Sequence, residues 1–231
     1  DQFEGPRGAA WVPSQPNWLI TNEAEGHRVK VTNVRTGAMI CKFGEYGEGD
    51  GQFNEPTGVT VTSDSCFVIV ADAGNDRLQV LKLVIAADGQ SAHLEFVRCI
   101  GDGGGQAEGQ LNYPGGVTLL GGGGTEQTIL VTDHDNHRVS EFGLDGTFVR
   151  IFAGTTRETD EYGDVPGSVE DGEFNGPAGI TVLPSSGEVA IADYRNHRVQ
   201  IFDLQGNFQR KFGSYGEEDG QFMRTDSLAS D

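Results

Sequence analysis

Cysteine is scarce in this sequence of 231 residues, which contains only Cys41, Cys66 and Cys99. An odd number of cysteines without a CxxC pair cannot form a closed disulfide framework. The sequence also has no Asn-x-Ser/Thr glycosylation site, no apolar run near the roughly 18 residues of a membrane span, and no basic-then-apolar leader at its start. These absences favour a soluble protein of intracellular origin and predict no membrane partner.

Basic residues are also few. Lys and Arg total 16 against 35 Asp and Glu, which gives a formal net charge of −19. A field of that sign repels phosphate backbones, so the composition disfavours nucleic acid as a partner. The chain begins with Asp1 rather than Met, and we therefore expect a processed chain or a piece of a longer parent protein with further domains.

Proline is rare as well, with 8 residues against 35 glycines. A collagen helix is excluded because the glycines do not recur every third residue. Glycine at about twice its usual share is too costly inside helices for a helical bundle. The hydrophobic share of 36% supplies material for a core, so the acidity does not predict disorder.

An internal repeat runs through the sequence. The phrase GQFNEPTGVTV at 51–61 recurs as GQLNYPGGVTL at 109–119, as GEFNGPAGITV at 172–182 and, more loosely, as QFEGPRGAAWV at 2–12. Each copy continues with a motif similar to RNHRVQI at 195–201 and ends with a motif similar to FQRKFG at 208–213. Such self-similarity is the signature of a repeat architecture.

Within one copy the hydrophobic period is two, in four short runs separated by turn residues, which predicts a four-stranded antiparallel meander. A meander has two faces to cover, and radial repetition into a β-propeller covers both. We therefore predict an all-β fold, a β-propeller of four-stranded antiparallel blades that forms one domain over residues 1–222. The predicted blades are about 1–50, 51–108, 109–171 and 172–219, and residues 223–231 form a tail or a truncated fifth repeat.

The repeated phrases resemble NHL repeats, which are called after an Asn-His-Leu-type tripeptide. That tripeptide is Asn196-His197-Arg198 in the last copy and Asn136-His137-Arg138 in the third, with Asn75-Asp76-Arg77 and Gly26-His27-Arg28 as departures. The resemblance covers almost all of residues 2–222. It implies a propeller that usually has about six blades, so the four copies predict either a four-bladed object or part of a larger ring.

The repeated positions are interpreted as scaffold. Glycines that follow the repeated prolines are expected to allow close backbone approach at the axis: Gly8, Gly58, Gly116 and Gly179. Large apolar residues ahead of the prolines are expected to wedge between blades: Phe3, Phe53, Leu111 and Phe174. A short acceptor at the end of the second strand is expected to bind the turn's own N–H groups: Asn22, Asp72, Asp133 and Asp193. Residues tolerant of positive φ are expected at Gly26, Asn75, Asn136 and Asn196. Arginines that open the third strand are placed to pair with a carboxylate: Arg28, Arg77, Arg138 and Arg198.

Function is expected where the copies differ, on the rim that carries the turns between second and third strands. The predicted partner-binding residues are His134, Asp135, His137, Tyr194, Arg195 and His197, together with Glu158, Asp160, Glu161, Tyr162 and Asp164 of an acidic insert. An acidic lip of this kind suits a basic protein or peptide partner.

Catalytic signals are weak. The EF-hand spacing and the Gly-x-Ser-x-Gly elbow are absent. His27, His137 and His197 occupy equivalent turns and would converge on the axis in a zinc site of the kind that resemblance to an amidating lyase implies, but the second copy has Asp76 in that place. We expect no cofactor, with calcium or zinc as the alternative.

The resemblance to the NHL domains of tripartite-motif ubiquitin ligases implies a docking platform for substrates or RNA, and the net charge argues against the RNA role. The function predicted from the sequence is a non-catalytic protein-binding scaffold. The alternative is a propeller-type lactonase or amidating lyase with an axial metal.

Overall fold

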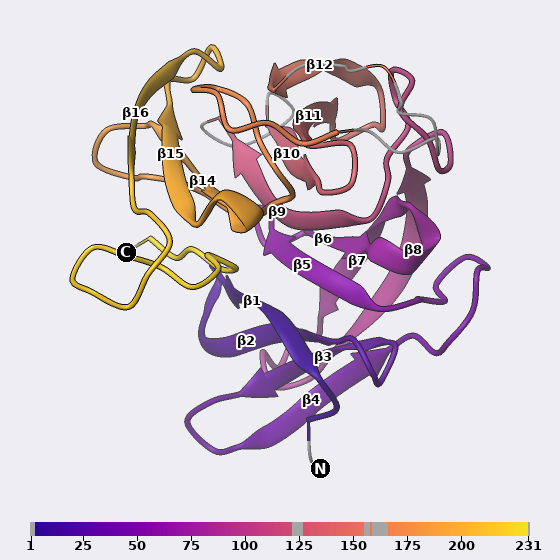
Figure 1. Cartoon of the computed structure of the whole chain (residues 1–231). Coiled ribbons are helices and arrows are strands. Elements are labelled where there is room, and N and C mark those ends of the chain that lie inside the picture. The colour runs from indigo at the N-terminus through magenta and orange to yellow at the C-terminus, as the bar shows by residue number, and fades with distance from the viewer. Residues whose placement is uncertain (1–2, 122–126, 155–157, 159–165, 231) are drawn as a thin grey trace.

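The chain folds into four sheets of four antiparallel strands, arranged as blades around a common axis (Figure 1). The computed structural model describes residues 3–121, 127–154, 158 and 166–230. In each sheet the strands follow one another in chain order. The predicted all-β fold is confirmed, and the protein is a four-bladed β-propeller. Among the described residues, no helix has the length and apolar character needed to cross a membrane.

Each blade runs from an inner strand at the axis to an outer strand at the periphery. The strands are, blade by blade, β1 (Pro6–Val12), β2 (Gln15–Glu23), β3 (Arg28–Asn33) and β4 (Ala38–Phe43); β5 (Pro56–Val61), β6 (Phe67–Asp72), β7 (Arg77–Ile85) and β8 (Ala92–Ile100); β9 (Pro114–Leu120), β10 (Thr128–Asp133), β11 (Arg138–Gly143) and β12 (Phe148–Ala153); β13 (Pro177–Val182), β14 (Val189–Asp193), β15 (Arg198–Phe202) and β16 (Phe208–Phe212). Short 3₁₀ turns, η1 (Ala73–Asn75) and η3 (Tyr194–Asn196), join the second and third strands of two blades.

The glycine after each repeated proline allows neighbouring inner strands to meet. Strands β1, β5, β9 and β13 contact one another in that order. A Cβ atom placed on Gly58 would lie 2.5 Å from the carbonyl oxygen of Gly115, and one on Gly116 would lie 2.6 Å from that of Ala178. No real side chain tolerates such distances, so glycine is required for the blades to converge at the axis.

Apolar side chains fill the space between successive blades. The wedge residues Phe53, Leu111 and Phe174 are fully buried in these cores, and burial of such a side chain contributes about 1.5–3 kcal/mol. Phe3, at the same place in the first repeat, is half exposed and lies over the ammonium of Lys30, 5.1 Å from ring centroid to Nζ. The first wedge therefore has no preceding blade to enter.

The C-terminal segment covers the free face of the fourth blade. Phe222 and Leu228 contact the buried residues Ala190, Val199 and Ile201 of that face. The amide of Gly179 donates to the carbonyl of Asp226 (2.8 Å), so the segment lies beside β13 as each inner strand lies beside the next. Residues 222–228 thus act as an apolar cap.

The first blade presents a different kind of face at the other end of the array. Its strands β2 and β3 pair Thr21 with Lys30 and Leu19 with Thr32 on the side away from the second blade. The equivalent pairs of the fourth blade, on the side that meets the third blade, are Ile191 with Gln200 and Val189 with Phe202. The first blade therefore replaces most of the apolar residues of that face with polar ones.

Candidate functional site

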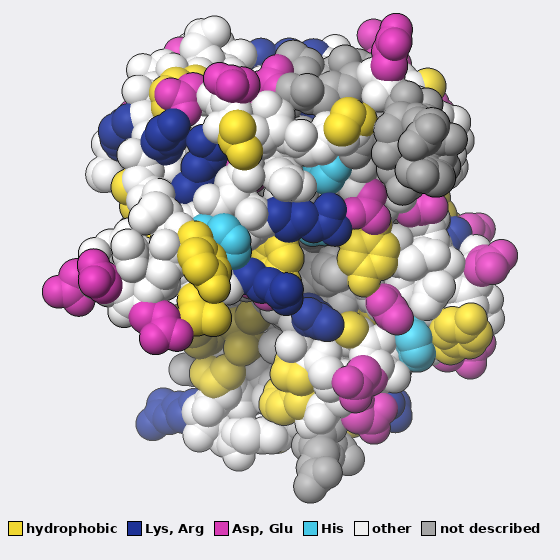
Figure 2. Space-filling model, viewed as in Figure 1, with side chains coloured by type: hydrophobic (Ala, Val, Ile, Leu, Met, Phe, Trp, Pro, Cys, Tyr) yellow, Lys and Arg dark blue, Asp and Glu magenta, His cyan; other side chains and the backbone are white. Residues whose placement is uncertain are grey.

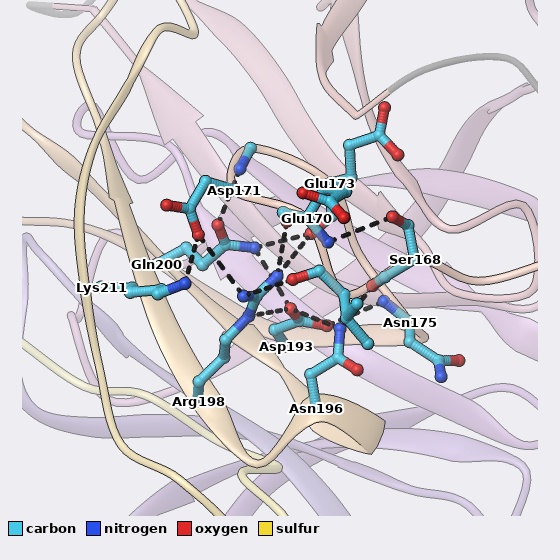
Figure 3. A network of polar contacts seen from close by, with 12 residues as sticks. Ser168, Glu170, Asp171, Glu173, Asn175, Asp193, Asn196, Arg198, Gln200 and Lys211 are labelled. Carbon is cyan, nitrogen blue, oxygen red and sulfur yellow. Dashed lines mark hydrogen bonds and ion pairs between the residues drawn. The ribbon is translucent and has the colours of Figure 1, made fainter.

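The turns between second and third strands are held by a buried carboxylate, shown for the fourth blade in Figure 3. Asp193 is fully buried and accepts hydrogen bonds from four donors: Asn175 N (2.8 Å), Asn196 Nδ2 (2.9 Å), Arg198 Nε (2.7 Å) and Gln200 Nε2 (3.1 Å). Arg198 also donates to three carbonyl oxygens of the loop ahead of the blade, those of Val169, Glu170 and Glu173. The network fastens each turn to the connection that enters its blade.

Blades two and three repeat this arrangement. Arg77 Nε lies 2.8 Å from Asp72, and Arg138 Nε lies 2.8 Å from Asp133. In the first blade the carboxylate belongs to Glu23, whose oxygens lie 2.6 Å from Arg28 and 2.7 Å from Lys30. Burial raises the pKa of Glu23, but the hydrogen bonds from Lys30 and Arg28 outweigh it and hold this pKa below its usual range.

Three sequence-based expectations about these turns need correction. The acceptor of the first blade is Glu23, and Asn22 accepts instead from the amide of Gly8 (2.6 Å). The 3₁₀ turns have no side-chain cap, so the carboxylates bind the preceding connection rather than the turn's own amides. Positive φ falls one residue later than expected, and in blades two to four the asparagine side chain ahead of that residue donates to the carboxylate. The residues in the left-handed region are His27, Asp76, His137 and His197.

Side chains at this left-handed position form a latch to the next blade. His27 Nδ1 accepts from the amide of Glu55 (3.2 Å), Asp76 Oδ1 accepts from that of Tyr113 (2.8 Å), and His137 Nδ1 accepts from that of Gly176 (2.8 Å). Histidine and aspartate can replace each other at this position because each side chain offers a hydrogen-bond acceptor to the backbone amide. The ring of His197 meets that of Tyr215 edge to face, with centroids 4.8 Å apart.

The three equivalent histidines do not gather at the axis, since His27 and His137 each bind their own blade junction and His197 contacts Tyr215 edge to face. Within the described ranges, no group of three or more His, Cys, Asp or Glu side chains is arranged to hold a metal ion.

A cavity of about 880 Å³ occupies the axis. Its walls are formed by the inner strands and the C-terminal segment, with Val59, Val117, Ile180 and Leu228 among the apolar lining residues. Figure 2 shows Lys and Arg side chains around the hollow at the centre of one face, next to hydrophobic and histidine side chains. We call the residues that border the cavity there the axial mouth: Arg7, Tyr113, His134, Tyr194 and Arg195, with Arg224 against Tyr194.

Rings of the axial mouth form a continuous crescent across the third and fourth repeats. The His134 ring centroid lies 6.2 Å from that of Tyr113 and 6.2 Å from that of Tyr194. The Arg224 guanidinium lies 5.5 Å from the Tyr194 centroid and donates to its hydroxyl (3.1 Å). Tyr113 donates from its hydroxyl to Glu55 (2.9 Å), and burial together with this carboxylate raises the pKa of Tyr113. These contacts preorganise an aromatic and cationic border.

His134 and Arg195 share a carboxylate at the edge of the axial mouth. Asp135 lies 2.8 Å from His134 Nδ1 and 3.8 Å from Arg195. The hydrogen bond from His134 holds the pKa of Asp135 below its usual range. The predicted residues His134, Asp135, Tyr194 and Arg195 are thus brought together.

The other predicted partner-binding residues lie apart from this group. His137 is buried at its blade junction. His197 is half-buried against Tyr215. Glu158 is exposed. Asp160, Glu161, Tyr162 and Asp164 lie outside the described residues.

Sequence reasoning missed Arg7, Tyr113 and Arg224. Tyr113 and Arg224 stand directly before the place of the repeated proline, and Arg7 stands directly after it. The same places hold Gly5, Glu55 and Gly176, or Thr57, Gly115 and Ala178, in other copies. The signal that could have found them is variation at positions flanking a repeated proline, read together with the axial location of that proline.

Four repeated blades around an axial cavity, fastened by recurrent carboxylate turns, define a repeat-built β-propeller. Residues 174–202 match the NHL repeat family model. The protein brain tumor of Drosophila melanogaster is 32% identical over 174 residues, which cover 75% of this chain and 14% of that protein. The B-box type zinc finger protein ncl-1 of Caenorhabditis elegans is 31% identical over 173 residues, 74% of this chain and 17% of that protein. The chain belongs to the NHL-repeat family.

The chain spans less than a fifth of the length of these two relatives. Among solved structures, a candidate gluconolactonase has a similar fold, with 18% sequence identity and a TM-score of 0.60 over 99% of this chain and 69% of that one. At this identity the similarity concerns the fold alone.

Proposed function

We propose that this NHL propeller is a non-catalytic protein-binding module that engages its partner through the axial mouth. The observation that carries the proposal is the crescent of Tyr113, His134 and Tyr194 with Arg195 at its edge. Tyrosine and arginine dominate the energetically important positions of protein interfaces. Here they border a cavity, so a partner side chain that enters it loses its contact with water.

Charge at the axial mouth differs from the acidic lip expected from the sequence. Arg7, Arg195 and Arg224 lie there in a chain whose formal net charge is −19. The proposal therefore rests on the described mouth and not on the insert.

The test is a selection of random dodecapeptides displayed on phage against the immobilised chain. We expect peptides that bind the wild type and lose binding to the Tyr194→Ala/Arg195→Ala variant. Arg35→Ala is the matched control, because Arg35 is exposed on the β3–β4 hairpin at the opposite rim. Circular dichroism checks that each variant is folded.

Two results would count against the module. Selected peptides that bind the wild type and the double variant equally would show that the axial mouth is not the binding site. Zinc or calcium retained stoichiometrically after dialysis, measured by elemental analysis, would favour the axial-metal enzyme instead.

A further inference from the structure

The described arginines differ in what they contact. Those that open the third strands bind buried carboxylates at 2.6 to 2.8 Å. Arg150 and Arg210 also form close ion pairs, with Glu141 and Glu188. In the part of the chain that the structure describes, Arg7, Arg35, Arg98 and Arg224 form no ion pair, and the carboxylate nearest to Arg195 is 3.8 Å away. Of these five, Arg7, Arg195 and Arg224 belong to the axial mouth.

Free donors at one place in an acidic protein point to an anionic ligand. An exposed guanidinium presents five N–H donors in a fork that fits a carboxylate. Arg224 is held in place by the Tyr194 ring and hydroxyl, which reduces the side-chain entropy lost on binding. The remaining donors of Arg7, Arg195 and Arg224 lie around one opening.

The cavity behind these arginines indicates a second property of the ligand, the kind of side chain that can enter it. Val59, Val117 and Ile180 supply apolar side chains to its wall, and Thr57, Thr118 and Thr181 supply hydroxyl groups. An apolar side chain entering this space would gain burial against Val59, Val117 and Ile180.

We propose that the axial mouth binds an acidic peptide in which carboxylates flank an apolar side chain, with the carboxylates on Arg7, Arg195 and Arg224 and the apolar group in the cavity. This inference rests on the proposed function and names the chemistry of the partner. Glu55, Asp135 and Asp226 lie around the same opening. A nucleic acid fits less well, because its phosphates recur at every nucleotide and would pass these carboxylates, whereas a peptide can place its carboxylates on the arginines and neutral groups beside them.

The test uses fluorescein-labelled peptides and fluorescence anisotropy at low ionic strength. The probe is a heptapeptide of six glutamates with phenylalanine at its centre. The comparison peptides replace phenylalanine by serine or all glutamates by lysine, and an octauridine RNA is the nucleic acid probe. We expect the first probe to bind most tightly and the lysine peptide not to bind.

Alanine variants test which arginines contribute to binding of the acidic peptide. Each of Arg7→Ala, Arg195→Ala and Arg224→Ala is expected to weaken binding about threefold, as for exposed ion pairs. The triple variant should weaken it by about tenfold or more, while Arg35→Ala leaves it unchanged. Binding should also fall as salt is raised from 50 to 500 mM, because ions screen exposed charges.

Several outcomes would overturn the inference. They are octauridine binding that depends on the same arginines, equal binding of the phenylalanine and serine peptides, and no effect of the triple variant. If the displayed peptides depend on the axial mouth but are basic or neutral, the protein-binding module stands and the acidic partner is wrong. If neither the displayed peptides nor the acidic probe depends on the axial mouth, both proposals fail.

Discussion

Removal of the Asp193 carboxylate should destabilise the propeller by about 3 kcal/mol. Asp193 is fully buried and accepts from four donors, one of them the guanidinium of Arg198. Deletion of one partner of a buried ion pair costs roughly 3–5 kcal/mol, because the other charge loses its compensation. Arg198 keeps three carbonyl acceptors, which places Asp193→Ala at the lower end of that range.

A double-mutant cycle separates the ion pair from the other lost contacts. Arg198→Met removes the charge, so Asp193→Ala should cost about 1–2 kcal/mol less in that background than in the wild type. Glu217→Ala is the control, since this side chain is exposed, and we expect a change within about 0.5 kcal/mol.

Urea denaturation followed by two probes measures the effect. Trp11 and Trp18 both lie in the first blade, so fluorescence reports on that blade while far-ultraviolet circular dichroism reports on all four. Coincident unfolding curves would show that the four blades unfold together, so that a loss of stability in the fourth blade also destabilises the first. A cost below about 1 kcal/mol, or strictly additive changes in the cycle, would refute the buried-pair reasoning.

Four further predictions concern the junctions and the ends of the array. His137→Leu should cost about 1–3 kcal/mol in urea denaturation by orphaning a buried amide, whereas His137→Asp should recover most of it; equal losses would refute the latch. Gly116→Ala should cost roughly 1–3 kcal/mol because its Cβ meets backbone at 2.6 Å, and a neutral change in melting temperature would contradict this. The pKa of Glu23 is lowered on folding, so its stabilisation is present above its unfolded pKa of about 4.3 and lost as pH falls through the folded value; wild type minus Glu23→Gln stability that grows on acidification would contradict the sign. Phe222→Ala should expose the fourth blade and lower stability by about 1–3 kcal/mol, and dye binding to apolar surface would rise with it; no change in either would remove the cap.

Much of the fold could be predicted from the sequence because the repeat imposes it. Pro56 and Gly58 recur as Pro177 and Gly179 with the same spacing to the Asp-x-x-Asn-x-Arg motif, the third copy lengthens that spacing, and the period-two runs between them define the strands. Positive φ was predicted at Asn136 but occurs at His137, as it does at His27 after Gly26. Residue preferences alone also did not show that the asparagine amide binds Asp133 and the carbonyl of Gly105.

The axial mouth was less accessible to prediction. His134 and Tyr194 could be placed on one rim, since they follow equivalent strands. Arg7 and Arg224 are separated by most of the chain, and only the closure of blades around the axis brings their neighbourhoods together. Side chains at the axis are brought together by the arrangement of the blades, and a short stretch of sequence carries no information on that arrangement.

The unequal ends of the blade array also govern how copies of the chain meet. Successive blades stack head to tail, and an array with two complementary apolar ends would continue that stacking from one molecule to the next as a filament. Here Phe222 and Leu228 cover the outer face of the fourth blade, and on the outer face of the first blade Lys30 is buried in an ion pair with Glu23 beneath the Phe3 ring. A second copy that packed there would have to displace Phe3 from Lys30 or the cap from the fourth blade. Side chains of the chain itself thus occupy both faces, which disfavours head-to-tail stacking of one copy on the next.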